Sequence, residues 1–165
     1  MADVTNSKIL QQIEGIQHIQ DALVVIIKTE WNAAIVDELE KGCQQILEQH
    51  HIKFKTVSVP GAIEIPFAIT QYWAGSHAPW AFIAIGAVVR GDTPHFDYVC
   101  QSVTSGITQL NLSLPVPVIF GILTVDNEQQ AKQRIGGTHG HKGEEAAITA
   151  IKMIILNQQL KEGEL

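Results

Sequence analysis

Residues 86–100 read GAVVRGDTPHFDYVC and join two contrasting patterns. The apolar run at residues 81–85 is typical of a buried strand, and a helical pattern begins near Phe96. The segment between them is therefore predicted to cross from a strand to a helix, as happens at the carboxyl edge of a parallel sheet.

The crossing contains residues that suit an anionic ligand. Gly91, Asp92 and Thr93 lie beside the free backbone N–H groups expected at the helix start, which together with the helix dipole can hold a phosphate. His95 lies one residue before Phe96, so its imidazole could reach the same pocket and transfer protons near neutral pH. We therefore interpret the crossing as a candidate ligand site.

Three further strand patterns alternate with helical patterns on both sides of the crossing. Residues 23–27 are five branched apolar residues in a row, which is typical of a strand covered on both faces. Other strands are predicted at residues 54–59 and 116–122, and helices around residues 35–47, 65–69, 96–110 and 144–160, with a short helix capped by Asn127 and ending near Arg134. The alternation predicts a three-layer α/β/α sandwich with a four-stranded parallel sheet in the flavodoxin-like order 2-1-3-4.

The segments that follow the predicted strands are rich in Gly, Pro, Asn and aromatic residues. They are residues 31–32, 60–62, 91–95 and 120–121. Parallel strands bring all such segments to the carboxyl edge of the sheet, where open α/β folds bind ligands. The candidate site is therefore expected at that edge.

Charge and composition narrow the classes of partner. The chain has 165 residues and a formal net charge of −6, and its 11 Lys and Arg are scattered, so we expect neither nucleic acid nor a membrane surface as a partner. No signal peptide or spanning segment is evident, and a cytoplasmic protein is expected. Residues 1–20 are predicted to form an N-terminal arm and residues 21–165 a single domain. Cys43 and Cys100 are interpreted as structural thiols.

Several residues allow two interpretations from the sequence alone. Trp31 is either a core residue at the edge of the sheet or a stacking platform for a flat ring. Glu64 suits a helix start as well as a ligand, and Arg134 and Lys142 suit either the surface or a phosphate. These alternatives stay open at this point.

Motifs for the common cofactors and metals are missing. The sequence has no Walker loop, G-x-G-x-x-G, nucleophile elbow or H-E-x-x-H. His139 and His141 could pair on a metal, but they have no other ligands at suitable spacing, and a Gly-rich connector with solvated imidazoles is the favoured interpretation. We expect no metal site.

Three segments resemble the signature segments of the 6,7-dimethyl-8-ribityllumazine synthase family, which carries out the penultimate step of riboflavin synthesis. They are residues 59–66 (VPGAIEIP), residues 86–100 and residues 118–124 (VIFGILT), and Lys142 with Gly143 fits as well. The likeness extends from about Ala22 to Asn157. It implies condensation of 5-amino-6-(D-ribitylamino)uracil with 3,4-dihydroxy-2-butanone 4-phosphate, without a cofactor.

The resemblance also implies roles for individual residues. His95 corresponds to the proton donor. The pyrimidine and ribityl side would be bound by Trp31, Ala62, Ile63, Glu64, Ala87, Val88, Val89 and Phe120, and the butanone phosphate by Asp92, Thr93 and Arg134, with Asn32, Gly91 and Lys142 as further candidates. Phe120 and Arg134 match positions that an adjacent subunit supplies in the family. Trp31 stands where Phe is more frequent, Asp92 where small neutral residues are usual, and Thr138 where Lys is often found.

The family likeness implies a homo-oligomer. Pentamers are expected, and the spacing of residues 136–143 favours a shell of sixty subunits over a free pentamer. Riboflavin synthase is a candidate partner. The alternative functions are a flavin or lumazine storage protein on the same scaffold and a purely structural shell. His95 together with Arg134 favours the enzyme, because a binding protein needs neither a proton donor nor a cation that promotes loss of phosphate.

Overall fold

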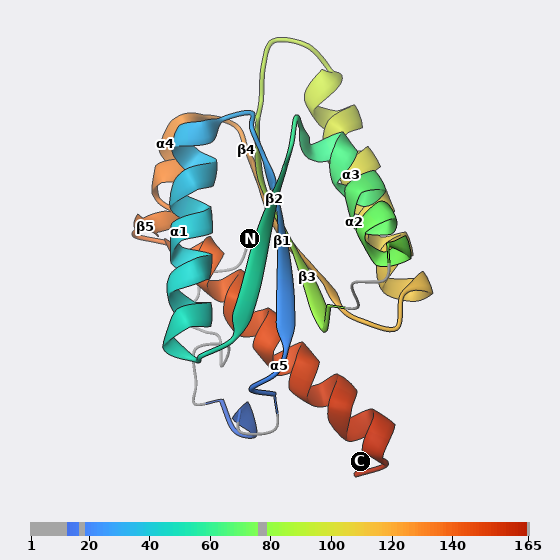
Figure 1. Ribbon diagram of the computed structural model, residues 1–165. Coiled ribbons are helices and arrows are strands. Elements are labelled where there is room, and N and C mark those ends of the chain that lie inside the picture. The colour runs from blue at the N-terminus through green and yellow to red at the C-terminus, as the bar shows by residue number, and fades with distance from the viewer. Residues whose placement is uncertain (1–12, 17–18, 76–78, 165) are drawn as a thin grey trace.

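The computed structural model describes residues 13–16, 19–75 and 79–164, which form a four-stranded parallel sheet between two layers of helices (Figure 1). The strand order is β2-β1-β3-β4, which confirms the predicted sandwich and its order. The elements are β1 (Leu23–Thr29), α1 (Ala33–Gln49), β2 (Lys53–Val59), a 3₁₀ turn η3 (Ala62–Glu64), α2 (Ile65–Ala74), β3 (Ala81–Val89), α3 (His95–Ser113), β4 (Val118–Val125), α4 (Glu128–Lys132), β5 (Ile135–Gly137), β6 (Gly140–His141) and α5 (Lys142–Glu162).

Both faces of the sheet are covered, and β1 shows why the sequence requires this. Val24 and Ile26 point into the core under α1 and α5, whereas Val25 and Ile27 point into the core under α2 and α3, and all four are fully buried. Successive strand residues face opposite sides, so an unbroken apolar run needs helices on both faces. Figure 1 shows α1 on one side of the strands and α2 and α3 on the other, and the core residues of α5 pack on the α1 side.

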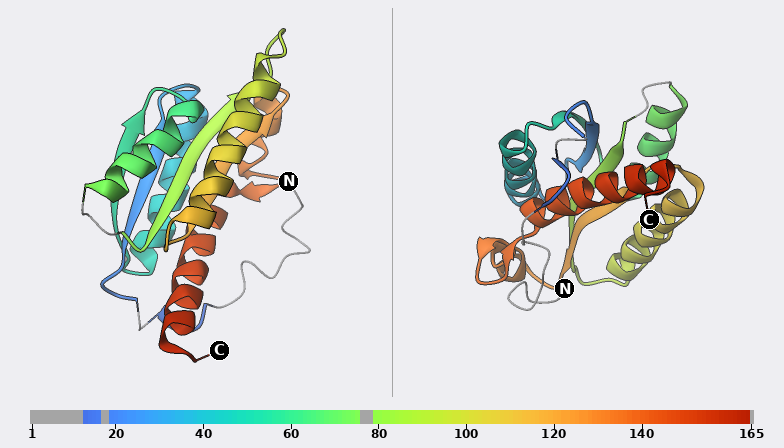
Figure 2. Two further views of the ribbon diagram at one scale, coloured as in Figure 1. Left: turned by 90° about the vertical axis from the view of Figure 1, so that its right-hand side faces the viewer. Right: turned by 90° about the horizontal axis from the view of Figure 1, so that it is seen from below.

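Helix α5 crosses the sheet diagonally, and its C-terminal end extends beyond the strands (Figures 1 and 2). Its start lies against α1 at two glycines. A methyl group on Gly143 would overlap the carbonyl oxygen of Leu39, and one on Gly42 would overlap the imidazole of His141. The two helices are therefore in backbone contact at this crossing.

Strands β3 and β4 differ from their predicted bounds at a glycine and at a proline. Strand β3 continues from residue 85 to Val89, paired with β4 as far as Val125. Gly86 does not end the strand but is a close-approach position, since a methyl group there would lie 3.2 Å from the Cγ2 atom of Thr29. Strand β4 begins at Val118, after Pro117, which has no N–H to donate. The strand runs through Phe120 and Gly121, as the predicted strand at residues 116–122 implies, and the second interpretation of these two residues as a loop after the strand was wrong.

The Gly-rich segment before α5 is ordered, which corrects the interpretation of His141 as a solvated side chain. Strands β5 and β6 form a small antiparallel hairpin, and the Nδ1 atom of His141 accepts a hydrogen bond from the N–H of Glu144 at 3.4 Å. The imidazole thereby caps α5. The prediction that Asn127 caps α4 is confirmed, since its Oδ1 atom accepts from the N–H of Gln130 at 3.0 Å.

The predicted N-terminal arm lies mostly outside the described residues. Within the described part, Ile19 is fully buried in the core beneath α1 and α5. Cys43 is buried in the same core, and burial raises the pKa of its thiol to about 12, in keeping with a structural role. None of the described helices combines the length and apolar character that a membrane crossing would need.

Candidate active site

A pocket of about 400 Å³ opens at the carboxyl edge of the sheet. It is built from the ends of β1, β2 and β3 and from the first turns that follow them. Its lining consists of Thr29, Trp31, Asn32, Gly61, Ala62, Ile63, Glu64, Ala87, Val88, Val89, His95 and Val99. The topology thus brings nine of the fifteen predicted site residues into one cavity.

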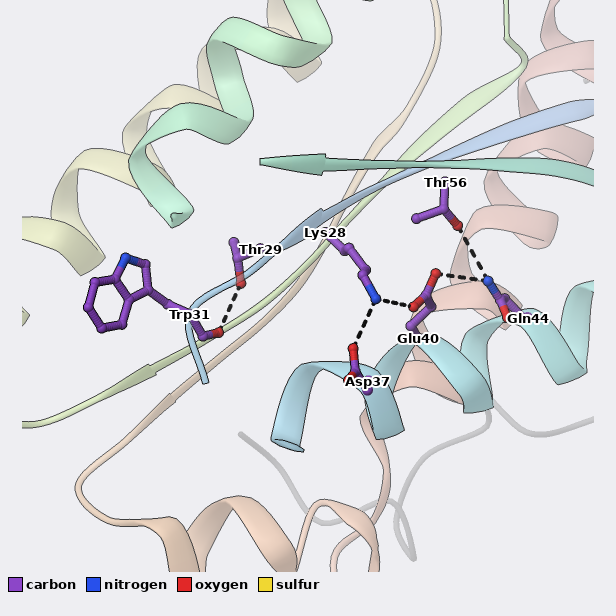
Figure 3. Close-up of polar contacts among 7 residues, drawn as sticks. All are labelled: Lys28, Thr29, Trp31, Asp37, Glu40, Gln44 and Thr56. Carbon is purple, nitrogen blue, oxygen red and sulfur yellow. Dashed lines mark hydrogen bonds and ion pairs between the residues drawn. The ribbon is translucent and has the colours of Figure 1, made fainter. Parts of the chain in front are cut away.

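Trp31 is presented to solvent at the end of β1. Its side chain is 72% exposed, so the alternative in which it is a core residue is not realised. Its N–H donates to the carbonyl of Pro60 at 3.3 Å, and the hydroxyl of Thr29 donates to the Trp31 carbonyl at 3.5 Å (Figure 3). The backbone is therefore tied to the neighbouring strand end while the ring stays free to stack on a ligand.

Asn32 closes the rim between β1 and β3. It adopts a left-handed conformation, with φ of 58°, and its Nδ2 atom donates to the carbonyl of Ala87 at 2.8 Å. Asn tolerates this backbone region better than most residues. This bond ties the residue after β1 to the middle strand β3 at the edge of the pocket.

Lys28 fixes the start of α1 behind this rim. Its Nζ atom lies 2.6 Å from Glu40 and 2.9 Å from Asp37, and the side chain of Gln44 joins Glu40 to Thr56 (Figure 3). The hydrogen bond to Glu40, followed by that to Asp37, raises the pKa of Lys28. Figure 3 shows the indole of Trp31 pointing away from this cluster. Lys28 and its partners do not line the pocket; they connect the end of β1 to α1 behind it.

Glu64 faces Trp31 across Gly61. A methyl group on Gly61 would lie 3.0 Å from the Oε2 atom of Glu64 and 3.4 Å from the Cδ1 atom of Trp31. Glu64 occupies the N-cap position of α2, where its charge suits the helix dipole, but its carboxylate makes no capping hydrogen bond to the helix. A flat ring and a carboxylate are thus presented to the same space.

His95 is the first residue of α3 and lies at the far wall of the pocket. Its side chain is exposed, and its N–H donates to the Oγ1 atom of Thr93 at 3.4 Å. Gly91, Asp92 and Thr93 are exposed in the preceding loop and do not line the cavity itself. A methyl group on Gly91 would meet no atom within 4 Å, so the space beside this loop is open.

Three predicted site residues lie elsewhere in the single chain. Phe120 is 40% exposed and lines a second hollow of about 530 Å³ between β4 and α5, together with Lys142. The Nζ atom of Lys142 is 2.8 Å from both carboxylate oxygens of Glu145 and is nearly buried, so Lys142 is neither a surface charge nor a free cation. Arg134 donates to the carbonyl of Gln130 at 2.8 Å.

Sequence reasoning missed two features around the site. The partner of Lys142 could have been found from the three-residue spacing to Glu145, which brings two side chains together on a helix. The second is an ion-pair cluster around Arg90, whose partners are Asp97, seven residues away, and Asp126, 36 residues away. Among the described residues, no three His, Cys, Asp or Glu side chains gather in a way that could hold a metal ion.

Comparison with known proteins shows the family of this chain. Residues 21–158 match the family model described as 6,7-dimethyl-8-ribityllumazine synthase. The chain belongs to this family. The synthase of that name from Porphyromonas gingivalis is similar to this chain. The two are 50% identical over 137 residues, which cover 81% of this chain and 84% of the relative. The synthase of Parabacteroides distasonis is 48% identical, over 78% of this chain and 82% of the relative. That of Phocaeicola vulgatus is 45% identical, over 85% of this chain and 84% of the relative.

Membership of the lumazine synthase family assigns the chain to riboflavin biosynthesis as a transferase. The matched range contains every residue that lines the pocket. The alternative of a storage protein on the same scaffold is not favoured, because the similar proteins are named as synthases.

Proposed function

We propose that the pocket at the carboxyl edge is where 5-amino-6-(D-ribitylamino)uracil condenses with 3,4-dihydroxy-2-butanone 4-phosphate to give 6,7-dimethyl-8-ribityllumazine, phosphate and water. The observation that carries this proposal is the arrangement of an exposed indole, a carboxylate and an imidazole around one cavity, supplied by Trp31, Glu64 and His95. Riboflavin synthase, which would use the product, is a proposed partner.

The pyrimidine side of the pocket suits the first substrate. Trp31 would stack on the flat ring, and the Glu64 carboxylate would accept hydrogen bonds from ribityl hydroxyl groups. Backbone groups at residues 62–63 and 87–89 would contact the chain and the ring edge. These contacts hold the amine in place for attack on the ketone, and positioning of this kind can supply much of the rate.

His95 would move protons during the condensation. Formation of the imine, loss of phosphate and ring closure each require proton transfer, and an imidazole can donate and accept protons near neutral pH. His95 lies on the loop side of the pocket, next to Gly91, Asp92 and Thr93, which we assign to the butanone phosphate. Asp92 adds negative charge there, so the phosphate would depend on backbone N–H groups and on an arginine.

We propose that Arg134 and Phe120 complete the pocket of a neighbouring copy within a pentamer. In the single chain neither of them lines the cavity, and the hollow containing Phe120 is open along the outer strand β4. Exposed apolar side chains on α5, including Leu160 at 60% exposure, support association with further copies. A shell of twelve pentamers is the larger assembly we propose.

The test is an absorbance assay for the lumazine chromophore with both substrates, compared with the reaction without protein. We expect formation above the spontaneous rate and a roughly 10- to 1000-fold lower turnover for His95→Ala, the range for loss of an acid–base group. His50→Ala is the matched control, because His50 lies at the end of α1, at the opposite edge of the sheet. The particle mass of both variants should equal that of the wild type.

Unchanged turnover in His95→Ala would remove His95 from the mechanism. A wild-type rate no faster than the spontaneous one, together with tight riboflavin binding, would instead support the storage function. In that case quenching of fluorescence should be lost in Trp31→Phe, which separates this indole from Trp73 and Trp80.

A further inference from the structure

Arg90 is the centre of a polar cluster beside the pocket. It directly follows β3, and its N–H donates to the carbonyl of Val125 at 2.9 Å, which continues the β3–β4 ladder. Its Nε atom donates to Asp126 at 2.9 Å, and its two terminal nitrogens donate to the two carboxylate oxygens of Asp97 at 3.3 and 3.1 Å. The guanidinium carbon lies 4.0 Å from the ring centre of Phe96.

These contacts hold both ends of the loop that contains His95. The loop leaves β3 at Arg90 and enters α3 at His95, and the two α3 residues that the guanidinium contacts, Phe96 and Asp97, belong to the first turn of that helix. Asp126 fixes the same guanidinium to the end of β4. A planar fork that binds two carboxylates has a defined orientation, unlike a flexible ammonium group. The loop is thus held by one side chain between two rigid elements.

The cluster continues to Arg134. The N–H of Asp126 donates to the side-chain oxygen of Gln130 at 2.9 Å, and Arg134 donates to the backbone carbonyl of Gln130 at 2.8 Å. Asp126 therefore contacts both Arg90, through its carboxylate, and a residue of α4, the short helix that precedes Arg134.

The charges indicate that Arg90 does not bind the phosphate itself. Its guanidinium already engages Asp97 and Asp126, and Asp92 adds a third carboxylate to this part of the surface. Without the arginine, two carboxylates would lie uncompensated beside the loop assigned to an anionic substrate. The Arg90 side chain therefore connects the start of α3 to the end of β4 and neutralises the carboxylates of Asp97 and Asp126.

We propose that Arg90 is a positioning residue for the phosphorylated substrate, acting through Asp97 and Asp126 to hold the loop from Gly91 to His95. The inference rests on the proposed assignment of that loop to the butanone phosphate. It adds to that assignment a residue that touches neither substrate.

The experiment measures KM for each substrate separately in Arg90→Met and Arg90→Lys. We expect both variants to raise KM for the butanone phosphate by about 10-fold or more, a size typical of lost positioning, with KM for the pyrimidine within about twofold of wild type. Lysine should not rescue, because an ammonium group cannot bind two carboxylates in a fixed fork. Lys53→Met is the matched control, since it removes an exposed ion pair, to Asp21, at the opposite edge of the sheet.

Asp126→Asn separates positioning from direct binding. If Arg90 acts through its anchors, Asp126→Asn raises the same KM, and the double variant Arg90→Met/Asp126→Asn is no worse than Arg90→Met alone. If Arg90 instead binds the phosphate, freeing it from Asp126 lowers that KM, which overturns the inference. Equal increases in both KM values would also overturn it, because they would indicate a general loss of structure, and the thermal unfolding temperature and particle mass report that independently.

Thr93→Val shows which proposal has failed. A raised KM for the butanone phosphate in Thr93→Val, with unchanged values in Arg90→Met, would disprove the role of Arg90 and leave the loop assignment in place. Unchanged values in both variants, with normal wild-type turnover, would disprove the loop assignment and the inference with it.

Discussion

At the scale of single residues, Gly61 controls the width of the space between Trp31 and Glu64. The Gly61→Ala methyl would lie 3.0 Å from the Glu64 carboxylate and 3.4 Å from the indole, both of which are ends of flexible side chains. The extended backbone of Gly61, with φ of −148°, accepts alanine without strain. We therefore expect unchanged stability but an increase of about 10-fold in KM for the pyrimidine substrate, because both contacts are displaced.

Steady-state kinetics with each substrate varied in turn would check this prediction. Gly75→Ala is the control, since its methyl group meets only ordinary contacts at the end of α2. A normal KM for the pyrimidine in Gly61→Ala would show that this substrate binds elsewhere.

The sequence predicted most of the residues around this space, but it could not decide whether each side chain is buried, exposed or engaged in a hydrogen bond. The interpretations of Trp31 and Glu64 each depended on exposure and on hydrogen bonds that only the folded chain defines. The cluster of Arg90 with Asp97 and Asp126 was not predictable for a related reason. Two of its members are 36 residues apart, and pairing over such a distance is set by which strand lies next to which.

At the scale of elements, the contact between α1 and α5 depends on Gly143. In Gly143→Ala the new methyl would overlap the backbone carbonyl of Leu39, so the two helices must move apart. Overpacking of this kind typically costs about 1–3 kcal/mol, and here the obstacle is backbone, which cannot rotate away. Urea unfolding at fixed protein concentration should show the loss, with Gly75→Ala again as the control. Equal stability of Gly143→Ala and wild type would contradict the close crossing.

Element types were predictable where a pattern was long and regular. The buried run of β1 and the period of α1 each gave the right element, and the cap at Asn127 was correct. Errors arose at glycines. The sequence does not distinguish a glycine that ends a strand from a glycine within a strand that allows close contact with neighbouring atoms. Gly86 and Gly121 are of the second kind: a methyl on Gly121 would lie 2.7 Å from the carbonyl oxygen of Ala84. The β5–β6 hairpin was missed because strands of three and two residues carry no alternation.

At the scale of the whole molecule, the sandwich and its strand order followed from the alternation of strand and helix patterns with short connections. These rules apply to a single chain. They did not indicate that the cavity of the single chain would lack Phe120 and Arg134; only the family resemblance implied that an adjacent subunit supplies these two positions. This separation is the structural reason for proposing that copies share their active sites.

Mixed assemblies of two variants test that sharing directly. His95→Ala chains keep Arg134, and Arg134→Ala chains keep His95, so a site between two copies can be intact only where the two kinds of chain are neighbours in the right order. Random co-assembly in a ring with head-to-tail contacts should make about a quarter of the sites intact, with a matching return of wild-type turnover. The assay is lumazine formation by co-refolded protein, with separately refolded and then mixed variants as the control. If Arg134 served the pocket of its own chain, every site in the mixture would carry one of the two changes, and co-refolding would give no more activity than the mixed control.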